Sequence, residues 1–159
     1  MFKNRYIKNV LSALAVAVFG FVLLNLTFLF DFLFQSLIVR FIKLFIPIIV
    51  DPEMDYHWFP PMMHASFVVV IGLISWFIFK SKLGKIYKAI YSTVPLAVVF
   101  ATIGIFLYRW PVLAYGINTL VFGVILFYLY KTKKPWIYYY TLILVALVLL
   151  IFTLSGGEI

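Results

Sequence analysis

Residues 51–64 read DPEMDYHWFPPMMH, and they decide the fold because residues 51–61 form the one sustained polar loop in an otherwise apolar chain and residues 62–64 begin the next apolar run. The stretch holds three of the five acidic residues and both histidines. The chain as a whole has 159 residues, of which 66% are hydrophobic, and a mean hydropathy of +1.14. One soluble core of this size cannot bury so much apolar surface, so we predict an all-α integral membrane protein.

Apolar runs that alternate with short polar turns lie on both sides of this loop. A helix needs about 20 apolar residues to cross the hydrocarbon core of a bilayer. The runs therefore predict a single transmembrane domain over residues 1–159, with five spanning helices at residues 10–30, 62–79, 89–108, 112–130 and 136–154.

Residues 31–47 are also apolar but carry several polar side chains. Ser36, Arg40 and Lys43 fall on one side of a helix that turns by about 100° per residue. We therefore predict a separate amphipathic or re-entrant helix at the outer membrane face, ending near Pro47. A second full crossing by this segment is the alternative.

Basic residues indicate the orientation of the chain. Ten of the thirteen lie in three short clusters beside apolar runs: Lys3, Arg5, Lys8, Lys80, Lys82, Lys85, Lys88, Lys131, Lys133 and Lys134. Such clusters favour the cytoplasmic side, which predicts a multi-pass protein of the plasma membrane with the N-terminus inside, the C-terminus outside and residues 51–61 extracytoplasmic. Topology accounts for the net charge of +8, so we predict no nucleic-acid partner.

The predicted outer rim gathers most of the side chains that can carry chemistry. Asp51, Glu53, Asp55, His57 and His64 are residue types that bind zinc or another divalent ion, which would be the cofactor. Asp55, His57 and His64 are also the candidate catalytic groups, because a histidine near its free pKa of about 6.5 suits proton transfer. The chain has no cysteine, which excludes thiolate ligands and a cysteine nucleophile.

Three basic residues, Arg40, Lys43 and Arg109, are predicted to lie on the same outer side. They suit an anionic ligand such as the phosphate of a lipid, since arginine can grip a phosphate with two parallel hydrogen bonds. Neutralising the carboxylates of the polar loop is the alternative role.

Polar and small residues inside the predicted spans indicate helix packing. Asn25 and Asn118 are candidates for hydrogen bonds between helices, and Gly116 and Gly123 allow close approach of a neighbour. The central portions of the predicted spans contain no Asp, Glu, Lys, Arg or His. This absence disfavours an ion-coupled transporter, which usually keeps an ionisable group at that depth.

Two short stretches resemble VanZ-type glycopeptide-resistance membrane proteins. A histidine opens the second predicted span with a glycine eight residues later (His64 and Gly72), and Arg109 precedes the Asn-Thr-Leu of residues 118–120. The chain lacks the acidic-lysine pair before the histidine and the aspartate ahead of the asparagine. We base no function on this resemblance.

The sequence favours a non-catalytic subunit, or a binding or accessory component, that acts at the outer leaflet. Its expected partners are the lipid bilayer and either another membrane protein or a second copy of the chain. One alternative is a small intramembrane enzyme that acts on a lipid-linked phosphate or a peptide through the histidine and acid cluster, with or without a metal. Another is an oligomeric hydrophobic channel or transporter.

Overall fold

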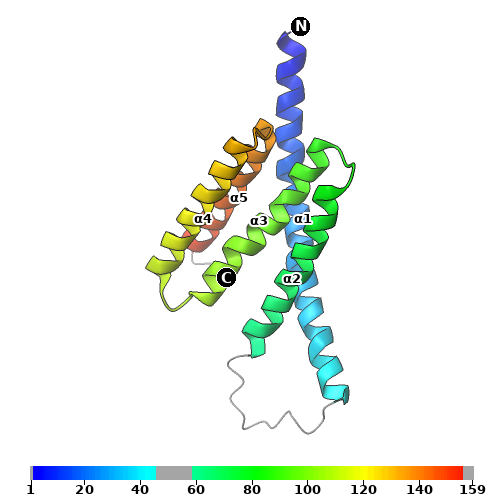
Figure 1. The fold of residues 1–159 in the computed structure, drawn as a ribbon, viewed down its shortest axis with the longest axis vertical. Coiled ribbons are helices and arrows are strands. Elements are labelled where there is room, and N and C mark those ends of the chain that lie inside the picture. Colours follow the sequence, from blue (N-terminus) through cyan, green and yellow to red (C-terminus); the bar gives the residue numbers. More distant parts are fainter. Residues whose placement is uncertain (1, 46–58, 156–159) are drawn as a thin grey trace.

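The computed structural model describes residues 2–45 and 59–155, and this part of the chain is all-helical (Figure 1). Each helix contains a stretch long and apolar enough to cross a membrane, as predicted. The helices are α1 (Phe2–Phe45), α2 (Phe59–Lys80), α3 (Lys85–Phe106), α4 (Pro111–Lys131) and α5 (Trp136–Leu154).

Short turns with clear local causes connect the last four helices. Pro111 occupies the first turn of α4 and Pro135 directly precedes α5, positions at which the missing N–H and fixed φ of proline favour a helix start. Lys88 donates hydrogen bonds of 2.7 Å from Nζ to the main-chain oxygens of Phe79 and Ser81. These bonds satisfy carbonyls at the end of α2 and fasten the turn to α3.

The prediction of a separate helix over residues 31–47 is wrong, because α1 continues without a break from Phe2 to Phe45. The described segment contains no proline or glycine that would end a helix at residue 30. Gln35 instead donates a hydrogen bond of 3.0 Å to Asp31 one turn earlier, across the expected boundary. A continuous helix also excludes a re-entrant hairpin or an independent second crossing within residues 31–45.

Helix α3 lies at the centre of the bundle and packs against each of the other four helices. Figure 1 shows α4 and α5 on one side of it and α1 and α2 on the other. Small residues explain this position, because they let neighbouring backbones approach closely. Its buried small residues are Ala89, Ser92, Thr93, Ala97 and Ala101.

The closest approach between α1 and α3 is at Gly20. A Cβ atom placed on Gly20 would lie 2.7 Å from Cγ2 of Thr93, a side chain that is itself almost fully buried. The threonine methyl therefore occupies the space that any larger residue at position 20 would need. This contact between Gly20 and Thr93 therefore helps to fix the position of α1 against α3.

We expect Gly20→Ala to unfold more easily than Gly116→Ala, by about 1–3 kcal/mol, because the added methyl collides with Thr93. Gly116 is the matched control, since nothing lies within 4 Å of a Cβ atom built on it. Both changes share the gain in helix propensity of about 1 kcal/mol. Equilibrium unfolding in mixed micelles, followed by circular dichroism, measures the difference, and equal stabilities would contradict the close contact.

Candidate functional site

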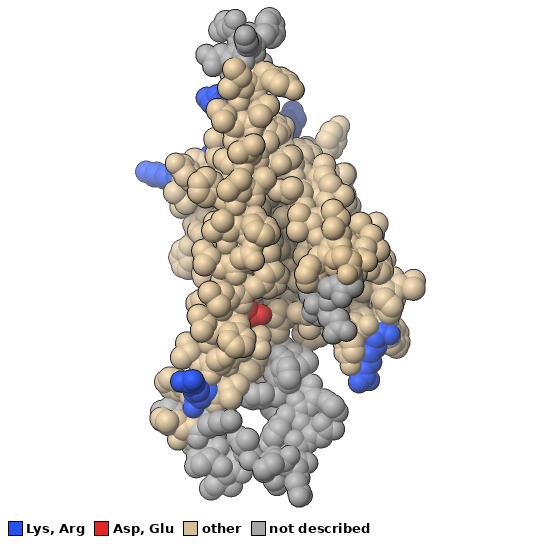
Figure 2. Space-filling view, turned by 180° about the vertical axis from the view of Figure 1, so that it is seen from behind, with Lys and Arg blue, Asp and Glu red and all other residues tan. Residues whose placement is uncertain are grey.

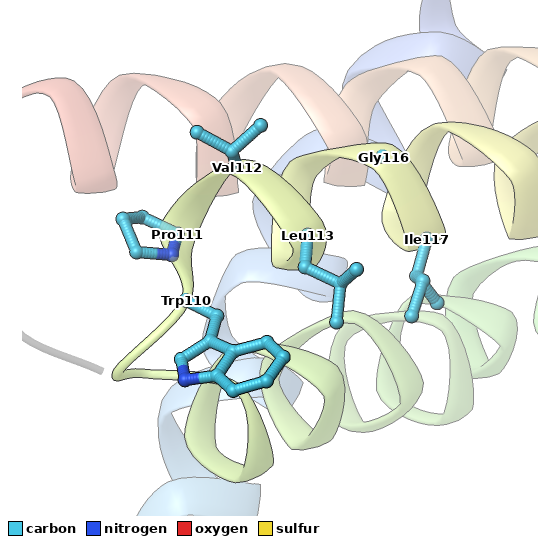
Figure 3. Close-up of a pocket in the computed structure, with 6 residues that line it drawn as sticks. All are labelled: Trp110, Pro111, Val112, Leu113, Gly116 and Ile117. Atoms are coloured by element: carbon cyan, nitrogen blue, oxygen red, sulfur yellow. The ribbon is translucent and has the colours of Figure 1, made fainter.

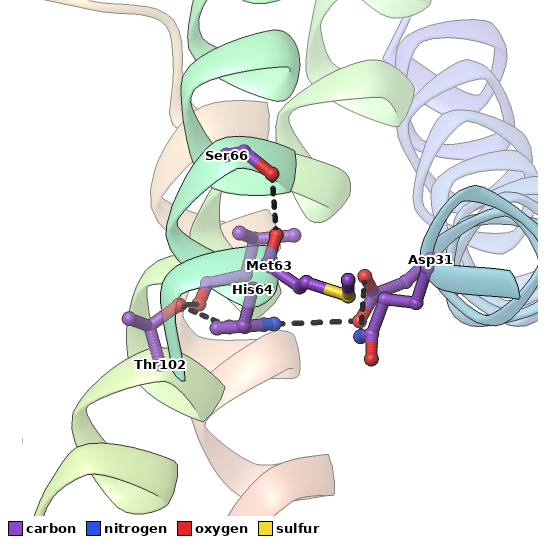
Figure 4. A network of polar contacts seen from close by, with 7 residues as sticks. Asp31, Met63, His64, Ser66 and Thr102 are labelled. Carbon is purple, nitrogen blue, oxygen red and sulfur yellow. Dashed lines mark hydrogen bonds and ion pairs between the residues drawn. The ribbon is translucent and has the colours of Figure 1, made fainter. Parts of the chain in front are cut away.

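The main polar contact between helices joins α1, α2 and α3 at the end of the bundle where α2 begins and α3 ends, which we call the His64 end. His64 Nε2 lies 3.0 Å from Thr102 Oγ1 of α3. On the other side of the ring, His64 Nδ1 lies 3.4 Å from Asp31 Oδ2 of α1. Figure 4 shows the imidazole between these two partners. We call the set Asp31, Gln35, His64 and Thr102 the polar junction.

The junction is largely enclosed but reaches the surface at Asp31. The side chain of His64 is 9% exposed and that of Asp31 is 15% exposed. Asp31 is the only acidic residue in the described part of the chain, and Figure 2 shows its red surface in a hollow between α1 and the rest of the bundle.

Aromatic side chains line the junction on the side of α1 and α2. The ring of Phe67 lies 6.2 Å from the His64 ring and 6.1 Å from the rings of Phe30 and Phe34. These apolar rings lower the local dielectric constant, which strengthens the attraction within a charged pair and raises the cost of an unpaired charge.

The order hydroxyl, imidazole, carboxylate matches that of a nucleophile, its general base and the group that orients the base. Thr102 Oγ1 also donates a hydrogen bond of 2.5 Å to the main-chain oxygen of Val98. Its single proton is then engaged, so the hydroxyl accepts a hydrogen bond from His64 Nε2. In this state both ring nitrogens of His64 face protein groups rather than an open substrate site.

Of the predicted metal and catalytic residues, the structure describes only His64. Asp51, Glu53, Asp55 and His57 lie outside the described residues. Across residues 2–45 and 59–155, no three His, Cys, Asp or Glu side chains gather closely enough to hold a metal ion. His64 therefore has one carboxylate partner in the structure, and that partner comes from α1 rather than from the loop.

The three residues predicted to bind an anion do not form one described site. Arg40 is exposed on α1. Arg109 lies beyond the end of α3, where its Nε donates a hydrogen bond of 2.7 Å to the hydroxyl of Tyr108. Lys43 belongs to α1, but its side chain is outside the described part of the structure. Figure 2 shows basic residues at separate edges of this end of the molecule.

The four residues predicted for helix packing make few contacts between the helices of this chain. Asn25 is exposed and donates to the main-chain oxygen of Phe21 in its own helix. Gly116 and Gly123 are exposed, with no neighbour close to a built Cβ atom. Asn118 is half-buried, and its Oδ1 has no hydrogen-bond partner among the described residues.

A shallow hollow of about 470 Å³ lies at the first turns of α4 (Figure 3). Apart from the indole N–H of Trp110, its walls offer only apolar contacts. It contains no titratable side chain, so it has no part in the chemistry of the junction. The residues that line it are Trp110, Pro111, Val112, Leu113, Gly116 and Ile117.

Sequence reasoning missed Asp31, Gln35 and Thr102 as members of the site. We expected Asp31 at the boundary of a shorter first span, whereas it lies within the apolar stretch Tyr6–Phe41. The i, i+4 spacing of Asp31 and Gln35 was the available signal for a continuous helix.

Comparison with known proteins assigns no family, since no family model, curated protein or solved structure matches the chain.

We expect Thr102→Val to lower the free energy of unfolding by about 1–3 kcal/mol, because it leaves the buried Nε2–H of His64 without an acceptor. Thr119→Val is the matched control, since the hydroxyl of Thr119 is exposed and bonds only to Tyr115 O of its own helix. Unfolding in mixed micelles measures both. Equal effects of the two changes would show that the contact between Thr102 and His64 contributes nothing.

Proposed function

We propose that the chain is a non-catalytic, multi-pass component of the plasma membrane that binds another membrane protein through the last part of α1. This part, residues 31–45, is called the C-terminal arm below. Three observations support the proposal: the exposed face of the arm, its length beyond the bundle and the internal pairing of the polar junction.

The exposed face of the arm carries the proposal. Leu33, Leu37, Arg40 and Leu44 are spaced at i, i+4, i+7 and i+11, so they lie on one side of the helix. Leu37 is 61% exposed and Leu44 is 78% exposed. The opposite side faces the bundle through Asp31 and Phe34. A helix that presents one apolar face suits insertion into an apolar groove of a partner.

The length of the arm favours a protein over lipid as the cover for this face. Leu44 lies thirteen residues beyond Asp31, which is about 20 Å at about 1.5 Å per residue. Asp31 is level with His64, near the start of the apolar stretch Met62–Lys80. A headgroup layer adds only about 5–8 Å beyond the hydrocarbon. When α1 runs parallel to the membrane normal, Leu44 lies beyond the headgroup layer, so lipid does not cover its side chain.

The distribution of lysines supports the proposed orientation. The turn between α2 and α3 and the turn between α4 and α5 both carry lysine clusters, at the end of the bundle opposite His64. Their placement on the cytoplasmic side puts the His64 end and the arm on the extracytoplasmic side. Arg40 then places one positive charge on the arm. This charge suits a partner groove that has an acidic side chain at the level of Arg40 along the helix.

A small intramembrane enzyme is the second candidate, because the junction has the hydroxyl, imidazole, carboxylate order. In this mechanism Thr102 Oγ1 attacks an acyl or phosphoryl group of a lipid-linked substrate while unprotonated His64 Nε2 takes the hydroxyl proton and Asp31 stabilises the imidazolium. The bond from that group to the leaving oxygen breaks, and His64 passes the proton to this oxygen as it departs. The hydroxyl must first leave Val98 O. Because this hydrogen bond must break before the reaction can begin, we rank the enzyme candidate below the binding function.

Leu37→Ala with Leu44→Ala is expected to reduce the fraction of the chain found in a larger membrane assembly at least tenfold, because each change removes about 1.5–3 kcal/mol of apolar contact. Blue-native electrophoresis of gently solubilised membranes measures this fraction. Val112→Ala with Leu120→Ala on α4 is the matched control, since these side chains are 85% and 66% exposed.

A wild-type chain that migrates alone from native membranes would contradict the binding function, as would equal losses from the arm and α4 variants. Co-purification of a differently tagged copy through the arm would replace the partner protein with a second copy of the chain.

The enzyme candidate predicts a covalent adduct on Thr102. Thr102→Ser is expected to retain the adduct, whereas Thr102→Val and His64→Gln lose it, because only serine keeps the nucleophilic hydroxyl and only histidine accepts its proton. Intact-protein mass spectrometry after incubation with a hydrophobic fluorophosphonate, which reacts with activated hydroxyls, provides the measurement. Absence of a wild-type adduct would remove the enzyme candidate.

A further inference from the structure

Arg109 lies in the turn between α3 and α4, and most of its hydrogen-bond donors have no partner among the described residues. Its Nε donates a hydrogen bond of 2.7 Å to the hydroxyl of Tyr108, and its guanidinium carbon lies 5.5 Å from the centre of the same ring. These contacts leave the N–H groups of the two terminal nitrogens unpaired within residues 2–45 and 59–155. Two such nitrogens can grip a phosphate with two parallel hydrogen bonds.

The charge of Arg109 has no acidic partner in the described part of the chain. Asp31 is the only acid there, and its carboxylate lies against His64. A guanidinium remains charged in proteins, so its attraction for an anion does not depend on pH. Arg109 lies just before the apolar stretch Pro111–Lys131, which puts it at the level of the lipid headgroups when α4 spans a membrane. The anions that a membrane supplies at this level are lipid phosphates.

The shallow hollow at the start of α4, called the α4 hollow below, begins at Trp110, the residue after Arg109. Figure 3 shows the indole of Trp110 on the same side of α4 as the side chains of Leu113 and Ile117, with its nitrogen toward the start of the helix. The indole N–H makes no hydrogen bond within the described part of the chain. Gly116 adds no side chain to the wall, and the space beside it is open.

The length of the α4 hollow matches part of an acyl chain. The helix rises by about 10 Å from Trp110 to Ile117, which is about a third of a hydrocarbon core of about 30 Å. Along this distance the groups change from a cation to an indole N–H and then to apolar side chains. A phospholipid has the same order, with a phosphate, ester carbonyls and acyl chains.

We propose that Arg109, Trp110 and the α4 hollow form a binding site for one anionic phospholipid. The terminal nitrogens of Arg109 hold the phosphate, the indole N–H of Trp110 donates to an ester carbonyl, and one acyl chain lies in the hollow along Leu113 and Ile117. Phosphatidylcholine has the same phosphate, but its own ammonium group already neutralises the charge. The site therefore prefers a lipid without a headgroup cation, such as phosphatidylglycerol.

This site is smaller than the anion site expected from the sequence, because Arg40 and Lys43 belong to α1 and take no part in it. It rests on the proposed membrane location of the chain but not on the proposed partner of the C-terminal arm. The lysine-rich turns also attract anionic lipids, at the opposite end of the bundle. A test therefore needs a reporter next to Arg109.

Trp110 is that reporter. Trp58→Phe, Trp76→Phe and Trp136→Phe leave it as the single tryptophan. The protein is placed in vesicles of equal parts phosphatidylcholine and phosphatidylglycerol, with bromine on the acyl chains of either one lipid or the other. Bromine quenches indole fluorescence on contact, so the two preparations compare the lipids at one site and one surface charge. We expect a preference of about fivefold for phosphatidylglycerol, from the attraction between one cation and one anionic headgroup.

Variants of the two outer arginines separate the site from general attraction. We expect Arg109→Gln to abolish the preference, and Arg109→Lys to leave an intermediate one, because lysine keeps the charge but not the two-pronged grip. Arg40→Gln is the matched control, since it removes one positive charge from α1 at the same end of the bundle, and the preference should persist in it.

Equal quenching by the two lipids in the protein with Arg109 intact would overturn the proposal and leave the membrane location standing. An equal loss of preference in Arg40→Gln and Arg109→Gln would also overturn it. Absence of quenching by either lipid would overturn both the site and the location of α4 in the membrane.

The place of the acyl chain has its own test. Gly116→Leu puts a side chain into the α4 hollow, whereas Gly123→Leu makes the same change about 10 Å further along the helix, outside the hollow. We expect Gly116→Leu to lower the preference at least twofold, because a lipid held at Arg109 can then no longer place its chain in the hollow, and Gly123→Leu to preserve it. Equal preferences in the two variants would overturn the placement of the chain in the hollow.

Discussion

An ionisable side chain can lie inside an apolar helical bundle only when its polar atoms find partners, because an unpaired charge there costs several kcal/mol. Asp31 and His64 meet this constraint together with Gln35 and Thr102. The four residues come from three helices, so satisfying them fixes how α1, α2 and α3 lie relative to one another at one end of the bundle. The aromatic rings around Phe67 make the requirement stricter by excluding water.

The α1 residues that pack in the described core clusters lie away from its ends: Val16, Leu23, Leu24 and Phe34. Small side chains on α3 allow the other four helices to pack closely against it. The close approach of Gly20 to Thr93 fixes the middle of α1 against α3. α1 has 44 residues and is therefore about 66 Å long, whereas a hydrocarbon core is about 30 Å thick. A helix twice as long as the membrane core has segments available for contacts outside it. The polar junction lies where the arm leaves the bundle.

The sequence predicted the number of long apolar helices and the approximate ends of the last four, because prolines and lysine-rich turns interrupt the apolar runs at those places. It did not predict the continuity of α1. Ser36, Arg40 and Lys43 gave residues 31–47 an amphipathic pattern, but α1 is continuous through residue 30 and on to Phe45, and Gln35 bonds to Asp31 across the expected boundary. His64 was recognised from its position at the start of a span. Its partners were not, because Asp31 and Thr102 lie 33 and 38 residues away along the chain and only the packing of three helices brings them together.

The interaction between Asp31 and His64 can be tested most directly by a double-mutant cycle with Asp31→Asn and His64→Gln in mixed micelles. Side chains in direct contact, here with His64 Nδ1 3.4 Å from Asp31 Oδ2, are expected to show a coupling free energy of about 0.5–3 kcal/mol. We predict that each single change destabilises the protein and that the double variant is more stable than the sum of the two losses. Strict additivity of the two losses would contradict the central claim that these side chains hold α1 and α2 together.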